Sequence, residues 1–297
     1  MFVKMETIIK YFDHIPSSHR SAILIGGILF FWLVEGAWPL FQFTYNKWKH
    51  AGTNIFFTLT TILVNFPLAF ILLKSSDWAV NSEFGVLQWL PEMPLWLKAL
   101  TGLLLLDFVG AWLAHWTQHK TKWMWRFHII HHADQHVDTT TANRHHPGES
   151  LIRFFFTTFA ILIAGAPMWL VFLYQSLSVI FSQFNHANII LPKWLDRVLS
   201  MLIVTPNMHH IHHHYIQPFT DSNYGNIFSL WDRLFGTFSW LEQKNIIYGI
   251  DTHPEPHENS RVKSLLKIPF QQYRHPTTSN PNEGEGNRTP QPAIFKS

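Results

Sequence analysis

Histidine is the residue type that carries the most chemical information in this sequence, because neutral imidazole is a common ligand of Fe, Zn, Cu and Ni. Fourteen of the 20 histidines lie between His115 and His214. Eight of these fall into one HxxxH motif and two HxxHH motifs: His115, His119, His128, His131, His132, His209, His212 and His213. A histidine-rich storage tract would lack this regular spacing.

The spacing within each motif matches one face of a helix, where residues three and four positions apart are neighbours. The first motif therefore directs two imidazoles to one side, and each of the other two directs three. A metal ion rarely takes more than six ligands and needs an open position if it is to react. Eight imidazoles therefore predict two metal ions. A single HxxxH motif is weak evidence, but three such motifs in one chain are hard to explain by chance.

Long apolar segments must position these motifs. Of the 297 residues, 47% are hydrophobic and 14% are charged, whereas a soluble domain carries about 25% charged residues. Residues 21–41, 53–73 and 95–116 are each long enough to cross a bilayer as a helix, which takes about 20 apolar residues. Residues 151–184 are too long for one span, and 165–167 predict a hairpin turn at their middle. The predicted fold class is therefore all-α, a multi-span integral membrane helical bundle with four to five hydrophobic segments.

The charged residues predict an orientation and a domain organisation. Lys and Arg are in excess in the loops after the first and third apolar segments, which marks the cytoplasmic side and places the histidine motifs there. The predicted domains are residues 1–94 with the N-terminal spans, 95–240 with the histidines, and 241–297 as a polar tail in which 277–292 are disordered. The absence of cysteine excludes disulfides and thiolate metal sites. A net charge of +3 is too small to indicate a nucleic-acid partner.

Short motifs outside the histidine clusters add to this pattern. Residues 142–149 contain an Arg-x-His-Pro-x-Glu element, and residues 185–188 read Asn-His-Ala-Asn. Residues 221–237 include Asp-Ser-Asn-Tyr-Gly and Trp-Asp-Arg-Leu-Phe-Gly-Thr. Together with the histidine spacing, these elements resemble the fatty acid hydroxylase/sterol desaturase superfamily of membrane di-iron oxygenases. The spacing is most similar to that of the alkylglycerol monooxygenase branch, and the resemblance covers residues 95–238.

The resemblance implies a helical membrane anchor with a cytosolic, histidine-rich helical cap that holds two iron ions through histidine alone. It makes His186 a ninth ligand and His146 a further candidate. It also implies O2 as a co-substrate. The electrons must come from an external donor, either a protein or a reduced small-molecule cofactor, because the sequence has no flavin or nicotinamide fingerprint.

Acidic residues near the motifs are candidates to orient the ligands, since a ligating imidazole usually donates its second N–H to a carboxylate or a carbonyl. Asp107, two helical turns before His115, and Glu149 are the first choices. We expect Arg144 to bind either Glu149 or a lipid head group. Four further carboxylates are candidates for the same orienting role: Asp134, Asp138, Asp221 and Asp232. The remaining histidines of this region are interpreted as structural residues or as neighbours of the ligands: His136, His145, His210 and His214.

The resulting hypothesis is O2-dependent hydroxylation of a C–H bond in a membrane lipid, which is a fatty acyl chain, a sterol or an ether lipid. Desaturation on the same scaffold is the closest alternative. A membrane zinc hydrolase is a second alternative, because imidazole also binds Zn. Eight ligands are too many for it, however, and the sequence lacks the HExxH motif. A metal carrier is a third alternative, but carriers usually place their ligands within the spans.

Overall fold

The computed structural model describes residues 5–276. Within these residues the backbone forms helices and isolated β-bridges but no strand, so the predicted all-α fold class is confirmed. The predicted disordered segment 277–292 lies outside the described residues. The α-helices are α1 (Met5–Asp13), α2 (Ser17–Ala37), α3 (Lys47–Asn81), α4 (Val86–Trp89), α5 (Leu95–Asp107), α6 (Ala114–Lys120), α7 (Lys122–His132), α8 (Pro147–Ala164), α9 (Met168–His186), α10 (Lys193–Leu199), α11 (Pro206–His212), α12 (Leu230–Leu234), α13 (Pro256–Asn259) and α14 (Val262–Lys267). Short 3-10 or π segments are η1 (Phe108–Leu113), η2 (Thr139–Asn143), η3 (Phe219–Asp221), η4 (Gln243–Asn245) and η5 (Ile268–Phe270).

Several helices have the length and apolar character of membrane spans. Four segments meet both criteria, namely Ser17–Ala37, Lys47–Trp89, Leu95–Lys120 and Pro147–Ala164. The first two bury little of their apolar surface inside the protein. On α3, for example, Leu63 is 72% exposed and Phe66 is 82% exposed. Such a surface is unfavourable in water and favourable in lipid, so the chain is an integral membrane protein.

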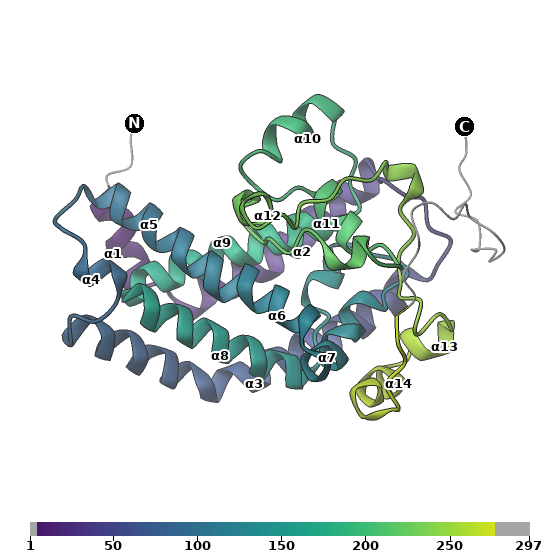
Figure 1. The fold of residues 1–297 in the computed structure, drawn as a ribbon, viewed down its shortest axis with the longest axis horizontal. Helices are drawn as coiled ribbons and strands as arrows, with labels where there is room; N and C mark the ends of the chain where they lie inside the picture. The colour runs from purple at the N-terminus through teal and green to yellow at the C-terminus, as the bar shows by residue number, and fades with distance from the viewer. Residues whose placement is uncertain (1–4, 277–297) are drawn as a thin grey trace.

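The long helices form a bundle (Figure 1). Helix α3 packs along α8, α9 packs against α1 and α2, and α5 contacts both α8 and α9. Leu106, Ile161 and Leu170 belong to the buried apolar core of this bundle. The predicted reversal at 165–167 is present, because α8 ends at Gly165, whose φ of +63° is the left-handed conformation that glycine adopts most easily, and α9 begins at Met168.

The two ends of the bundle differ. At one end α4 meets the turn between α8 and α9, where the side-chain amide of Gln88 donates a hydrogen bond to the carbonyl of Gly165 at 2.7 Å. At the other end the loop after α2 meets the segment after α7, where the Tyr45 hydroxyl donates to Asp138 at 3.0 Å. The short helices α7 and α11 to α14 lie at this second end (Figure 1). All three histidine motifs therefore come to one end of the bundle.

A π-helical segment, η1, connects α5 to α6. The sequence predicts an uninterrupted α-helix over residues 95–116, so the structure corrects this expectation. A π-turn takes in one more residue than an α-turn and changes which faces the flanking residues occupy. Asp107 at the end of α5 and His115 on α6 are therefore no longer two regular turns apart on one face. Such turns are common at functional sites.

Candidate metal centre

Nine histidines from four helices converge at the second end of the bundle. Helix α6 carries His115 and His119, and helix α7 carries the second motif. Helix α11, together with His213, the residue that follows it, carries the third. His186 is the last residue of α9. Helix α11 begins with Pro206, and the Thr205 hydroxyl accepts a hydrogen bond from the backbone N–H of Met208. This cap fixes the start of the helix that presents the third motif.

The first histidine group combines three of the motifs. Its five members offer ligand nitrogens that lie within 4.8 Å of one another: His115, His119, His128, His132 and His212. The Nε2 atoms of His115 and His128 are 3.0 Å apart, and those of His132 and His128 are 3.2 Å apart. All five side chains are buried.

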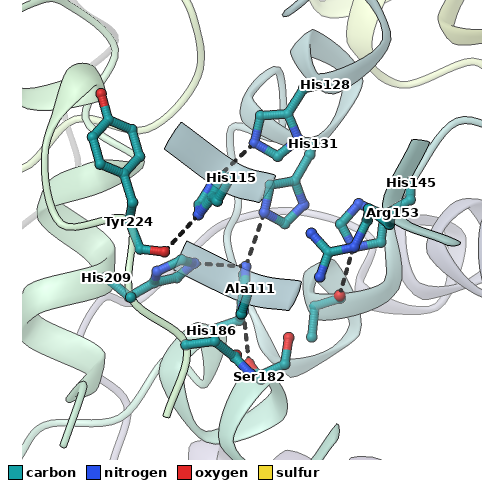
Figure 2. Close-up of a pocket in the computed structure, with 13 residues that line it drawn as sticks. Ala111, His115, His128, His131, His145, Arg153, Ser182, His186, His209 and Tyr224 are labelled. Atoms are coloured by element: carbon teal, nitrogen blue, oxygen red, sulfur yellow. Dashed lines mark hydrogen bonds between the residues drawn. The ribbon is translucent and has the colours of Figure 1, made fainter. Parts of the chain in front are cut away.

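The second histidine group has four members, His131, His186, His209 and His213, whose ligand nitrogens also lie within 4.8 Å of one another. His186 is central in this group. Its Nε2 lies 3.1 Å from that of His131, 3.0 Å from that of His209 and 3.2 Å from that of His213. Figure 2 shows the rings of His115, His128, His131, His186 and His209 turned toward one another.

The two HxxHH motifs divide between the groups, which corrects the expectation that each motif directs three imidazoles in one direction. In α7, the pair His128 and His132 enters the first group and His131 enters the second. In the third motif, the pair His209 and His213 enters the second group and His212 enters the first. Each group thus takes a pair four residues apart from one motif and the remaining histidine from the other.

The tautomers of these rings indicate that a cation belongs between them. His115 Nδ1–H donates to the carbonyl of Tyr224 at 2.9 Å, and His128 Nδ1–H donates to Glu149 at 2.8 Å. Both Nε2 atoms therefore carry lone pairs when the rings are neutral, yet they are 3.0 Å apart. Two nitrogens bound to one metal at about 2.1 Å and at right angles would be about 3.0 Å apart. The residues therefore fit a metal ion.

The second group has the same arrangement. The Nδ1–H of His186 donates to the carbonyl of Ser182 at 2.7 Å, so its Nε2 presents a lone pair to three other imidazoles.

In the first group, the buried Nε2 atoms of His119 and His212 have no hydrogen-bond partner within residues 5–276. Unpaired buried polar atoms are unfavourable, and a bound metal ion would satisfy them.

The electrostatic surroundings keep the imidazoles available as ligands. Burial, followed by repulsion from neighbouring imidazoles, holds the pKa of His131, His132, His209 and His213 well below the usual value. For His212, burial and the nearby His119 also lower the pKa well below that value. These rings are neutral at pH 7, which is the form that binds a metal.

Comparison with protein families matches residues 99–237 to the family described as fatty acid hydroxylase. This segment contains all nine histidines of the two groups. Residues 99–237 are therefore similar to the fatty acid hydroxylase family, and they are named the hydroxylase domain after it. The match confirms the resemblance seen in the sequence.

Named relatives of the hydroxylase domain act on lipids. The chain is 25% identical to the ornithine lipid hydroxylase of Rhizobium tropici over 59% of its own length and 50% of that protein. It is 25% identical to the alkylglycerol monooxygenase of Danio rerio over 85% of its own length and 53% of the relative. A cholesterol 25-hydroxylase-like protein of Danio rerio is 32% identical over 46% of the chain and 53% of that protein. The chain spans about half the length of these relatives, and no solved structure matches it.

Two of the predicted carboxylates contact histidines of the hydroxylase domain. Glu149 accepts from His128, and Asp221 lies 3.1 Å from Nδ1 of His119. Asp107, by contrast, accepts hydrogen bonds from the backbone N–H groups of Ile227 and Phe228 and touches no histidine.

Asp232 also contacts backbone rather than imidazole. It accepts from the backbone N–H groups of Tyr224 and Gly225 at 2.8 and 2.9 Å. It thereby holds the Tyr224 carbonyl that orients His115. The remaining predicted carboxylates, Asp134 and Asp138, contact His50.

Other residues singled out in the sequence lie outside both groups. Arg144 donates to the carbonyl of Ile130 at 2.8 Å and to Asn54 at 3.0 Å, so the expected contact with Glu149 or a lipid head group is wrong. His146 accepts from Gly148 N–H and caps α8. The remaining three histidines have neighbours of their own: His136 stacks on Tyr45, His210 packs on Tyr248 and His214 accepts from Ile247 N–H.

The sequence interpretation missed two residues beside the groups. His145 lies 2.9 Å from Glu149 and stacks on His131 with a ring separation of 4.8 Å. Arg153 lines the small cavity at the histidines, which measures about 30 Å3 and has room for a molecule the size of water or O2. The signal for both was present, since His145 belongs to the Arg-x-His-Pro-x-Glu element and Arg153 interrupts an apolar segment.

Proposed function

We propose that the hydroxylase domain holds one iron ion in each histidine group and hydroxylates a C–H bond of a membrane lipid with O2. The observation that carries the proposal is the set of imidazole lone pairs directed at one another in two adjacent buried groups. Imidazole is a suitable ligand for iron. An all-histidine site differs from the mixed Glu and His ligation of soluble di-iron bundles.

The overall reaction is RH + O2 + 2 electrons + 2 protons to ROH + H2O. Bound iron supplies O2 activation, which protein side chains cannot perform. The chain holds the metals through the nine histidines, with Glu149 and Asp221 orienting two of the rings. An external donor, either a protein or a reduced small-molecule cofactor, supplies the electrons.

The proposed substrate is a lipid that enters from the bilayer. Three observations support this: the histidine groups lie at the ends of apolar spans, the spans expose apolar side chains, and the named relatives act on lipids. We further propose that the histidine end of the bundle faces the cytoplasm, because the Lys- and Arg-rich loops meet there. Such loops mark that side of a membrane.

Metal analysis and oxygen labelling test the proposal. The purified full-length chain is expected to contain two irons and, when reduced, to place one atom from 18O2 into a lipid product. The His131→Ala variant is expected to lose metal and activity while keeping its helical circular dichroism. His257→Ala changes an exposed histidine and serves as the control.

The other outcomes separate the competing functions. Lipid-dependent O2 consumption that yields a double bond without oxygen incorporation would identify a desaturase. Zinc as the bound metal, without oxygen chemistry, would contradict the oxygenase proposal and favour a hydrolase. Full metal content in His131→Ala would contradict the ligand assignment.

A further inference from the structure

Arg153 is a positively charged residue in a predominantly apolar span. It lies six residues after Pro147, the first residue of α8, and its side chain lines the cavity beside His128, His131 and His145. Figure 2 shows its guanidinium entering the pocket next to His145. Ionisable residues within membrane spans are energetically unfavourable, and those that persist usually serve a function.

The charge of Arg153 is not neutralised within the part of the chain that the structure describes. Its guanidinium forms no ion pair and no hydrogen bond with any of residues 5–276. Glu149, one helical turn earlier, is the carboxylate on the same helix face, but it is engaged by His128 and His145. Arg144, by comparison, is fully buried and donates to three partners.

The surroundings of Arg153 suit the charged end of a lipid. The polar residues Ser182 and Asn226 line the same cavity. On the same helix, Phe155 is 62% exposed and Phe159 is 53% exposed, so α8 also borders the lipid phase. A guanidinium binds carboxylate and phosphate through paired, charge-assisted hydrogen bonds, which are strongest away from water.

We propose that Arg153 binds the anionic head group, a carboxylate or a phosphate, of the lipid that is hydroxylated. That the bound lipid is the substrate rests on the proposed function. The cavity has room for a molecule the size of O2, so the head group binds at its rim, where α8 borders the lipid phase. The carbon that reacts therefore lies close to the charged end of the lipid. Neutral lipids lack the group that would pair with Arg153.

Equilibrium binding of three radiolabelled probes with the same 16-carbon chain tests this proposal. The probes are hexadecanoate, hexadecyl phosphate and neutral 1-O-hexadecylglycerol, added without reductant to the metal-loaded full-length chain in a non-ionic detergent. At least one anionic probe is expected to bind ten times more tightly than the neutral probe. A preference for the carboxylate indicates a fatty acid, and a preference for the phosphate indicates a phospholipid.

Variants at this position provide the decisive comparison. Arg153→Gln is expected to reduce binding of the preferred anionic probe about tenfold and to leave binding of the neutral probe unchanged, while Arg153→Lys retains part of the preference. Arg20→Gln is the matched control, because the Arg20 guanidinium lies over the Phe172 ring, 4.8 Å from its centroid, and does not line the cavity.

Three results would overturn the proposal. The wild type could bind all probes equally, Arg153→Gln could keep the preference for the anionic probe, or Arg153→Gln could lose the same amount of affinity for charged and neutral probes. The readout is independent of catalysis. Charge-selective binding that depends on Arg153, in a protein that forms no oxygenated product, would contradict the proposed hydroxylase function and leave the anion site established.

Discussion

Glu149 accepts a hydrogen bond from Nδ1–H of His128 at 2.8 Å, and both side chains are buried. The same carboxylate oxygen lies 2.9 Å from Nδ1 of His145. One acidic residue at the start of α8 therefore fixes the ring of a proposed ligand on α7 and lies beside a second imidazole. The contact also sets the tautomer of His128, so that its Nε2 lone pair is directed into the first histidine group.

Replacing Glu149 is expected to weaken metal binding although Glu149 is not itself a proposed ligand. Glu149→Ala removes the acceptor for His128, and loss of such a partner typically lowers metal affinity 10–100-fold. Glu149→Gln keeps one acceptor oxygen and is expected to lose less metal affinity than Glu149→Ala. Chelator competition followed by metal analysis measures the change. Glu242→Gln is the control, because Glu242 pairs with Lys244 on the exposed surface; an unaltered affinity in Glu149→Ala would refute the orienting role.

Paired substitutions in the third motif can test how the histidines divide. His209 and His213 belong to the second group, whereas His212 belongs to the first. The double variant His209→Ala/His213→Ala is therefore expected to lose one of two metal equivalents. His209→Ala/His212→Ala removes a ligand from each group and is expected to weaken both sites. Metal-to-protein ratios distinguish these patterns, and identical losses in the two variants would contradict the division.

Asp232 is expected to be important for stability rather than for metal ligation. It accepts hydrogen bonds from the indole N–H of Trp112 at 2.9 Å and the Thr237 hydroxyl at 2.7 Å, in addition to two backbone N–H groups. Asp232→Ala leaves these buried donors unpaired, which costs about 1–3 kcal/mol for each donor that water does not reach. Thermal unfolding in detergent should show a large decrease in melting temperature. Thr237→Ala removes a single donor and should have a much smaller effect.

The low pKa values of the clustered histidines predict acid sensitivity of the metal-free protein. Burial lowers the pKa of His131 and His209 in the folded state, whereas the unfolded chain binds protons near the ordinary value of about 6.5. Below that pH the unfolded state binds more protons, so stability decreases as the pH falls. Melting temperatures of the metal-free protein at pH 7.5 and pH 5.5 measure this. Equal stability at the two values would show that these rings do not stay neutral in the folded protein.

Local sequence patterns were sufficient to predict the long apolar helices and histidine clusters that could bind a metal. Apolar segments of span length form helices wherever they are placed in lipid, and histidines three or four residues apart necessarily lie near one another on a helix. The turn at Gly165 likewise follows from its own residues. The domain boundaries at 94/95 and 240/241 stay predictions.

The sequence by itself determined an apolar helical chain with three histidine motifs, because hydrophobicity and helical spacing are local properties. Only the tertiary structure decided which histidines meet. The division of each HxxHH motif depends on how α7 and α11 are rotated against each other, and the position of Asp107 relative to His115 depends on the π-turn between them. Contacts such as those of Glu149 with His128 and of His186 with His209 join separate helices. No spacing within one segment specifies such contacts, since the packing of whole helices sets them.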